Sequence, residues 1–232
     1  RNGDTYSFLT DEEQDIAIDI RNTTVDSQAI VASIGQTIFS EIYPSKKYKY
    51  NKYDFPYDQY IDETLVGAAT GGVRLRFVSV ASDYYNAPEA KLIMDSQANN
   101  EAIVLLSSTV QYFEELETAA KIRKYIKQKN VSQLPESIQD IIRKRQAQAR
   151  TLEDSAKKQI EKAIVDGTFY ICGEKADIKS GEAKAKLDEA LKQLIESVYS
   201  KLNLVNVFRE SDADVLKVLN GEPEQGGFAG QG

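Results

Sequence analysis

The run AIVLLS at residues 102–107 is continuously apolar, as expected of a β-strand that is covered on both faces. Upstream, VRLRFVSV at residues 73–80 alternates apolar residues with Arg74 and Arg76, which predicts a strand with one partly polar face. After Ser108 the apolar period becomes helical. This mixed order, without regular βαβ alternation, predicts an α+β fold, or an irregular α/β fold, with a mixed sheet packed by amphipathic helices.

The helical pattern over residues 109–166 predicts a long antiparallel hairpin. Its apolar stripes are narrow, as in a coiled coil, and NVSQLPES at residues 130–137 provides the connection. We expect this hairpin to form an arm on the rest of the chain. The stripe positions are Val110, Phe113, Leu116, Ala120 and Ile126 in one helix, and Ile138, Ile141, Ala149, Leu152, Ala156, Ile160 and Ile164 in the other.

The stretch YSFLTDEEQDI, residues 6–16, predicts a short strand over residues 5–9 followed by a helix. Thr10 fits the N-cap, and Glu13 stands three residues later, so each side chain can bond a backbone N–H in a capping box. A second helix is predicted from about Asp26 to a stop at Pro44. Its apolar face carries Ile30, Ile34, Ile38 and Ile42.

The segment KKYKYNKYDFPYDQYID, residues 46–62, has a period near two and predicts at least one strand whose tyrosines share a face. TFYICGEKADI, residues 168–178, predicts a hairpin that turns near Gly173–Glu174. We expect an amphipathic helix next, with its apolar positions at Leu187, Leu191, Leu194, Val198 and Leu202. A short last helix is predicted at about residues 212–219.

These patterns divide the chain into a mixed part (1–108), the arm (109–166), a hairpin with C-terminal helices (167–221) and a Gly-rich tail (222–232). The chain starts at Arg1 rather than methionine, so we expect a piece of a longer polypeptide.

Composition excludes several classes of function. The chain has no histidine and one cysteine, so the usual zinc sites and every imidazole-dependent triad lack their ligands or bases. Cys172 stands in an apolar run, which indicates a reduced, buried thiol and a cytoplasmic protein. No apolar run approaches the roughly 18–20 residues that span a bilayer, so no membrane partner is expected.

Two motifs invite a catalytic interpretation that their context does not favour. GAATGG at residues 67–72 is Gly-rich, but Val73 and Arg74 replace the Lys and Ser/Thr of a phosphate-binding P-loop. An inter-strand loop is favoured there. The acidic residues near the start suit Mg²⁺ or Ca²⁺ chemically, yet they lie on a capped helix, which favours a solvated face. They are Asp11, Glu12, Glu13, Asp15 and Asp19. We therefore expect no catalytic, cofactor or metal residue.

Charge is unevenly distributed along the chain. Residues 1–42 hold eight acids and two bases, whereas residues 121–163 hold twelve bases and five acids. The basic arm either contacts DNA phosphates or, as we favour, meets an acidic neighbour. Its candidate residues are Lys121, Arg123, Lys124, Lys127, Arg143, Lys144, Arg145 and Arg150, and a second basic group is Lys46, Lys47, Lys49 and Lys52.

Next to that second group, Tyr48, Tyr50 and Tyr53 could stack nucleic-acid bases. Packing on a core with wet hydroxyl groups is the favoured alternative for these tyrosines.

The stretch YSFLTDEEQDI resembles the segment that follows the ATPase domain in the large P-loop protein of bacteriophage-exclusion (BREX) systems. Looser matches, in the same order, are the KYKY strand, the AIVLL strand, the helix with KIRKYI, and the FYICGEKADI hairpin before LIESVYSKL. The resemblance implies a large AAA-type ATPase that forms oligomers and acts with a methyltransferase and other defence proteins against phage. ATP and Mg²⁺ would bind outside this chain, since no position here matches a nucleotide-binding motif.

Three functions remain open at this point. The first is a non-catalytic structural and interaction region of such an ATPase, which contacts other domains, subunits or defence proteins. The second is a DNA-binding module that acts through the basic arm. The third and weakest is a carboxylate enzyme that uses Glu12 or Glu13.

Overall fold

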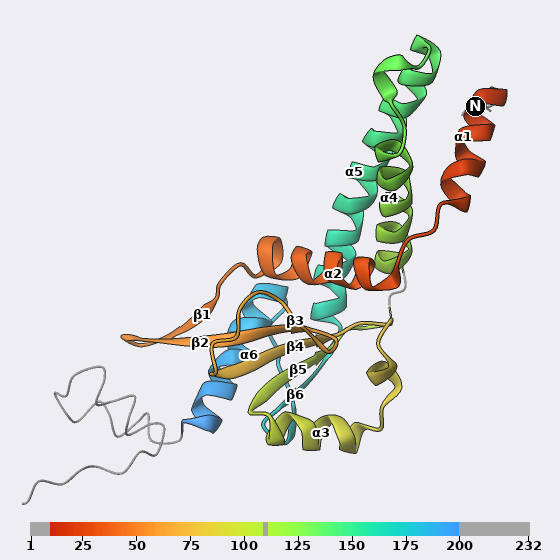
Figure 1. Cartoon of the computed structure of the whole chain (residues 1–232). Helices are drawn as coiled ribbons and strands as arrows, with labels where there is room; N and C mark the ends of the chain where they lie inside the picture. The colour runs from red at the N-terminus through yellow and green to blue at the C-terminus, as the bar shows by residue number, and fades with distance from the viewer. Residues whose placement is uncertain (1–9, 109–110, 200–232) are drawn as a thin grey trace, which may run out of the picture.

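The computed structural model describes residues 10–108 and 111–199. The strand predicted over residues 5–9, Val110, Leu202, the helix at 212–219 and the tail at 222–232 lie outside these residues. Figure 1 shows a sheet body from which a pair of long helices projects. No helix among the described residues combines the length and hydropathy needed to cross a bilayer.

The body is built on a mixed seven-stranded sheet, which confirms the predicted α+β class. Its order is β1-β2-β4-β5-β6-β7, with the short β3 paired beside β2. The neighbours β2, β4 and β5 are parallel, and all other pairs are antiparallel. The strands are Lys47–Tyr50 (β1), Tyr53–Ile61 (β2), Thr64–Leu65 (β3), Val73–Val78 (β4), Glu101–Leu105 (β5), Thr168–Ile171 (β6) and Glu174–Ala176 (β7).

Strand β5 lies inside the sheet, as its apolar run predicts. Ala102, Ile103 and Val104 are fully buried because helices cover both faces. It pairs with β4 on one side and with β6 on the other, so strands from before and after the arm join one sheet.

Within residues 10–108 and 111–199, six α-helices cover the sheet, form the arm or pack on the arm. One face of the sheet packs against α2, the C-terminal part of α5, and α6, and α3 lies on the opposite face (Figure 1). The helices are Asp11–Asn22 (α1), Ser27–Thr37 (α2, continued by a π-helical turn at Ile38–Ile42), Glu89–Ala98 (α3), Gln111–Lys127 (α4), Glu136–Val165 (α5) and Ala183–Val198 (α6).

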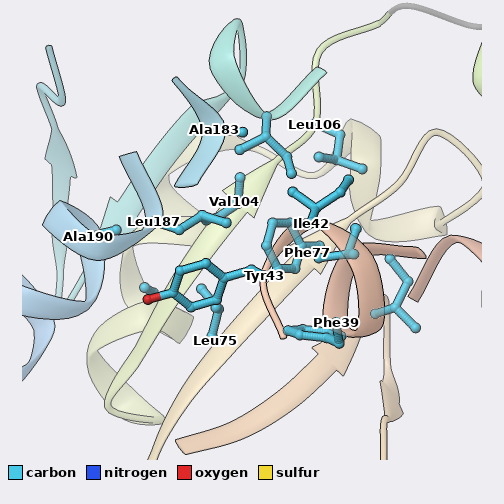
Figure 2. Close-up of a cluster of buried hydrophobic side chains, with 14 of the residues drawn as sticks. Phe39, Ile42, Tyr43, Leu75, Phe77, Val104, Leu106, Ala183, Leu187 and Ala190 are labelled. Atoms are coloured by element: carbon cyan, nitrogen blue, oxygen red, sulfur yellow. The ribbon is translucent and has the colours of Figure 1, made fainter. Parts of the chain in front are cut away.

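The main core lies between the sheet and the first layer of helices. Figure 2 shows Phe39 and Ile42 of the π-helical turn beside Phe77 of β4 and Leu187 of α6. The rings of Phe39 and Phe77 meet edge to face, with centroids 5.4 Å apart. The predicted stripe of Ile30, Ile34, Ile38 and Ile42 is buried, and the helical segment ends before Pro44 as expected.

Helix α3 and the 3-10 turn Asp83–Asn86 before it are absent from the expectations above. The apolar stripe of α3 is too short to stand out, because only Leu92 and Ser96 are buried while Met94 is 68% exposed. Leu92 covers Val78, Ile103 and Tyr170 on the second face of the sheet.

One turn and one buried stripe differ from the sequence prediction. The β6–β7 turn is Cys172–Gly173, one residue earlier than expected, because both residues adopt positive φ (46° and 92°), as a type I′ turn requires. In α4 the innermost stripe includes Tyr112 and Tyr125, which a search for apolar residues passes over. Phe113, Ala120 and Ile126 lie half-buried beside that stripe.

Candidate interaction surface on the helical arm

Helices α4 and α5 form the predicted arm, with the 3-10 turn Val131–Gln133 between them. Figure 1 shows the pair running side by side away from the sheet, with α1 alongside. The 30-residue α5 is about 45 Å long at 1.5 Å per residue. Its C-terminal part carries Ala156, Ile160 and Ile164 in the main core, whereas Ile141 and Ala149 belong to the arm. One continuous helix therefore joins the body to the arm.

Helix α1 begins with the predicted capping box. The Glu13 backbone N–H donates to the Thr10 hydroxyl over 3.2 Å, and the Thr10 N–H donates to the Glu13 carboxylate over 3.1 Å. The Thr10 bond, together with Lys144, holds the pKa of Glu13 below its ordinary value. The acidic stretch thus fixes where α1 starts.

The apolar face of α1 packs on the arm. Ile16 and Ile20 are buried in a small cluster with residues of both arm helices. The cluster combines isoleucines and one tyrosine with two alanines. The arm members are Ala119, Ile122, Tyr125, Ile141 and Ala149.

Polar contacts flank this apolar seam. Lys144 lies 3.5 Å from Glu13, and Lys129 lies 4.0 Å from Asp19. Lys124 Nζ donates to the backbone carbonyl of Thr24, just beyond α1, over 2.7 Å. Acidic α1 is thus the neighbour that part of the basic arm meets, in agreement with the interpretation favoured above.

Other cations of the arm are held within the hairpin. Arg123 forms a two-point bond with Glu153 across the helices, with both N···O distances at 2.5 Å, which raises the pKa of its guanidinium group. Lys121 pairs with Glu117 at 2.8 Å. These contacts link α4 and α5 or brace one turn of a helix.

Two further arginines of α5 also have near neighbours. Arg143 pairs with Asp140, and Arg145 donates to the amide oxygen of Gln148 over 2.8 Å. Lys127 and Arg150 are exposed, and neither has a hydrogen bond or ion pair within residues 10–108 and 111–199.

The second basic group lies on the body, not on the arm. Lys46, Lys47, Lys49 and Lys52 belong to the β1–β2 hairpin at the sheet edge, remote from the tip of the arm (Figure 1). Lys47 pairs with Asp54 at 2.5 Å, and the Lys52 ammonium lies 5.0 Å from the centre of the Tyr53 ring. The structure does not bring the two basic groups together.

The tyrosines of this hairpin face the core, as favoured above. Tyr48 and Tyr50 pack partly against it, and Tyr53 is 8% exposed. The Tyr50 hydroxyl donates to Glu196 of α6 over 3.0 Å, which raises its pKa. These rings hold β1 against α6.

The remaining motifs have structural roles. In the loop at residues 67–72, the Thr70 hydroxyl donates to the buried Asp58 carboxylate over 2.7 Å, which ties the loop to β2. Cys172 is half-buried in the β6–β7 turn, and burial raises the pKa of its thiol. No group of three or more acidic, histidine or cysteine side chains poised for a metal ion occurs among the described residues.

A cavity of about 250 Å³ lies between α1 and the arm. It brings Arg21 of α1 next to Lys121 of α4 and Arg145 of α5. The sequence does not predict a role for Arg21, because this residue lies in an acidic helix and no spacing along the chain links it to the arm.

Comparison with known families gives one match. The family model described as "BREX ATP-binding protein BrxC 4th domain with six-stranded beta sheet" matches residues 23–194. This range contains the whole sheet and arm but not α1. The six-stranded path β1-β2-β4-β5-β6-β7 agrees with that description, and β3 adds two residues beside it. No solved structure matches the chain.

Proposed function

Since the chain belongs to the BREX BrxC fourth-domain family and so has a role in a phage-defence system, we propose that it is a non-catalytic structural and interaction region. In this proposal the sheet body anchors the region within a large ATPase, and the arm with α1 contacts other domains, subunits or defence proteins. ATP and Mg²⁺ bind elsewhere in that parent protein, which acts in the cytoplasm.

The observation that carries this proposal is the continuity of α5. One end of this helix is buried in the main core with Ile160 and Ile164, and the other end carries the arm. A helix of about 45 Å packed at both ends moves as one body, because bending it would break its packing. A partner bound on the arm can therefore be coupled mechanically to the body.

The proposal is tested in the full-length ATPase by reversing exposed charges on the arm. In Lys127→Glu/Arg143→Glu/Arg150→Glu we expect co-purification of the other defence proteins to fall about tenfold. ATP hydrolysis by the purified ATPase should stay at the wild-type rate. The matched control, Lys179→Glu/Lys184→Glu/Lys192→Glu, makes the same charge change at exposed positions of the body outside both candidate basic groups.

Retained co-purification in the arm variant would contradict the proposal, as would an equal loss in the control. The alternative of a DNA-binding arm has its own readout. It requires the arm variant to weaken DNA binding at low salt and to flatten its salt dependence, while co-purification in nuclease-treated lysate stays intact.

A further inference from the structure

The cavity between α1 and the arm has an apolar part and a cationic part. Ala17, Ile20 and Ile122 supply the apolar part. The cations come from three different helices and are Arg21, Lys121 and Arg145. The described residues that line the cavity include no aspartate or glutamate.

The three cations are not neutralised by their own neighbours. Lys121 has one carboxylate partner, Glu117, at 2.8 Å. Arg145 bonds only the neutral amide of Gln148, and Arg21 has no bonded partner among the residues that the structure describes. In the described part of the chain, Glu117 is thus the one carboxylate paired directly with these three cations, and Glu13 is near enough to Arg145 for that charge to lower its pKa. The cavity keeps a local excess of positive charge on an acidic chain of net charge −7.

We propose that this cavity binds a carboxylate side chain from an acidic segment of a partner protein. The arginine forks of Arg21 and Arg145 suit two-point bonding to a carboxylate. The apolar residues suit the methylene groups of a glutamate side chain. This inference rests on the proposed function in taking the occupant to be a protein, and it adds where on the arm the partner is anchored.

Size and surrounding charge favour a protein carboxylate over a nucleic acid. At about 250 Å³ the cavity lies below the 300–1,000 Å³ typical of sites for whole small molecules, so it suits one side chain. Duplex DNA carries one charge per roughly 1.7 Å, and its backbone would pass within a Debye length of about 8–10 Å of the carboxylates of α1 and Glu117. A carboxylate side chain places one charge in the cavity, and the flexible peptide that carries it can hold its other charges away from α1, so it meets less of that repulsion than a stiff duplex.

The test uses a fluorescein-labelled glutamate decapeptide titrated with the 232-residue chain at low salt, followed by anisotropy. We expect Arg21→Gln/Arg145→Gln to weaken peptide binding about tenfold or more, because two charge-assisted bonds are lost. The control Lys158→Gln/Lys162→Gln, which removes two other exposed cations of α5, should change it less than about twofold. Arg21→Lys/Arg145→Lys keeps both charges and should recover part of the loss.

Three results would overturn the inference: no binding of the peptide by the wild-type chain, an equal loss in both glutamine variants, or tighter binding of a single-stranded oligonucleotide of equal charge at the same arginines. Unchanged thermal unfolding of each variant shows that a loss of binding does not come from misfolding.

Different results contradict this inference and the proposed function. If the arm charge-reversal variant loses its partners while peptide binding does not depend on the cavity, only this inference fails. If peptide binding depends on the cavity but no arm variant loses a partner, the proposed function fails.

Discussion

The body and the arm are stabilised in different ways. In the body, the sheet and parts of four helices (α2, α4, α5 and α6) bury a large cluster in which Ile34, Leu75, Phe77 and Leu194 have no exposed surface. The seam between α1 and the arm buries seven residues, two of them alanines, and its edges are ion pairs whose side chains are partly exposed. Burial of apolar area stabilises far more than exposed ion pairs do.

This difference makes the body a stable scaffold and makes the seam between α1 and the arm a surface that can open. The free energy needed to expose a segment falls with the apolar area it buries, so α1 should leave the arm long before the sheet unfolds. Contacts of such modest strength are also ones that a partner can replace.

Phe77→Ala should destabilise the whole chain by about 3–5 kcal/mol, because it removes a fully buried ring that packs against Phe39. Urea unfolding followed by circular dichroism measures the loss. The control Met94→Ala, at a side chain that is 68% exposed, should stay within about 0.5 kcal/mol. A small effect of Phe77→Ala would show that the body is not the rigid part.

Ile20→Ala should lower the opening free energy of α1 by about 2 kcal/mol, because the side chain is buried against the arm. Amide hydrogen exchange should report faster exchange in α1, with β5 unchanged. The control Ile18→Ala makes the same chemical change in the same helix at a residue that is 50% exposed, and it should have little effect. Faster exchange in β5 would mean that seam and body unfold together.

Thr10→Ala should destabilise α1 by about 0.5–2 kcal/mol, because the Glu13 N–H loses its acceptor at the N-cap. Thr10→Ser keeps the hydroxyl and should retain most of the stability. Amide exchange over the first turn of α1 separates the two variants. Equal behaviour of alanine and serine would contradict the capping role.

The smallest effect concerns pH and the body. Burial raises the pKa of Glu101 above its ordinary 4.5, although Arg76, 3.2 Å away, opposes the shift. The folded state therefore holds this proton more tightly than the unfolded state. The resulting stabilisation is present below pH 4.5 and is lost as pH rises through the folded pKa.

Urea midpoints measured from pH 4 upward should show this loss in the wild type. The isosteric variant Glu101→Gln has no carboxyl group to titrate and should lack that part of the slope. Identical slopes in the two proteins would contradict the assignment of the titration to Glu101.

The structural features that could be predicted from the sequence are those that depend on residues close together in the chain. The capping box at Thr10 and Glu13 depends on a spacing of three, and β5 shows its burial through an unbroken apolar run. Helix α3 was missed because a helix that buries only Leu92 and Ser96 leaves almost no periodic signal.

The candidate site was predictable only in part. The charge imbalance indicated that the arm meets an acidic neighbour, but the identity of that neighbour as α1 depends on a contact between Glu13 and Lys144, 131 residues apart. The cavity could not be predicted from the sequence, because Arg21, Lys121 and Arg145 come together only when three helices pack.

In the proposed function, the arm with α1, and not the sheet body, contacts the partners. Hydrogen–deuterium exchange on the full-length ATPase, alone and with its co-purified defence proteins, tests this most directly. We predict that the complex slows exchange in residues 11–22 and 111–165 and leaves β2, β4 and β5 unchanged. Protection confined to the body, with exchange in the arm unaltered, would contradict the claim.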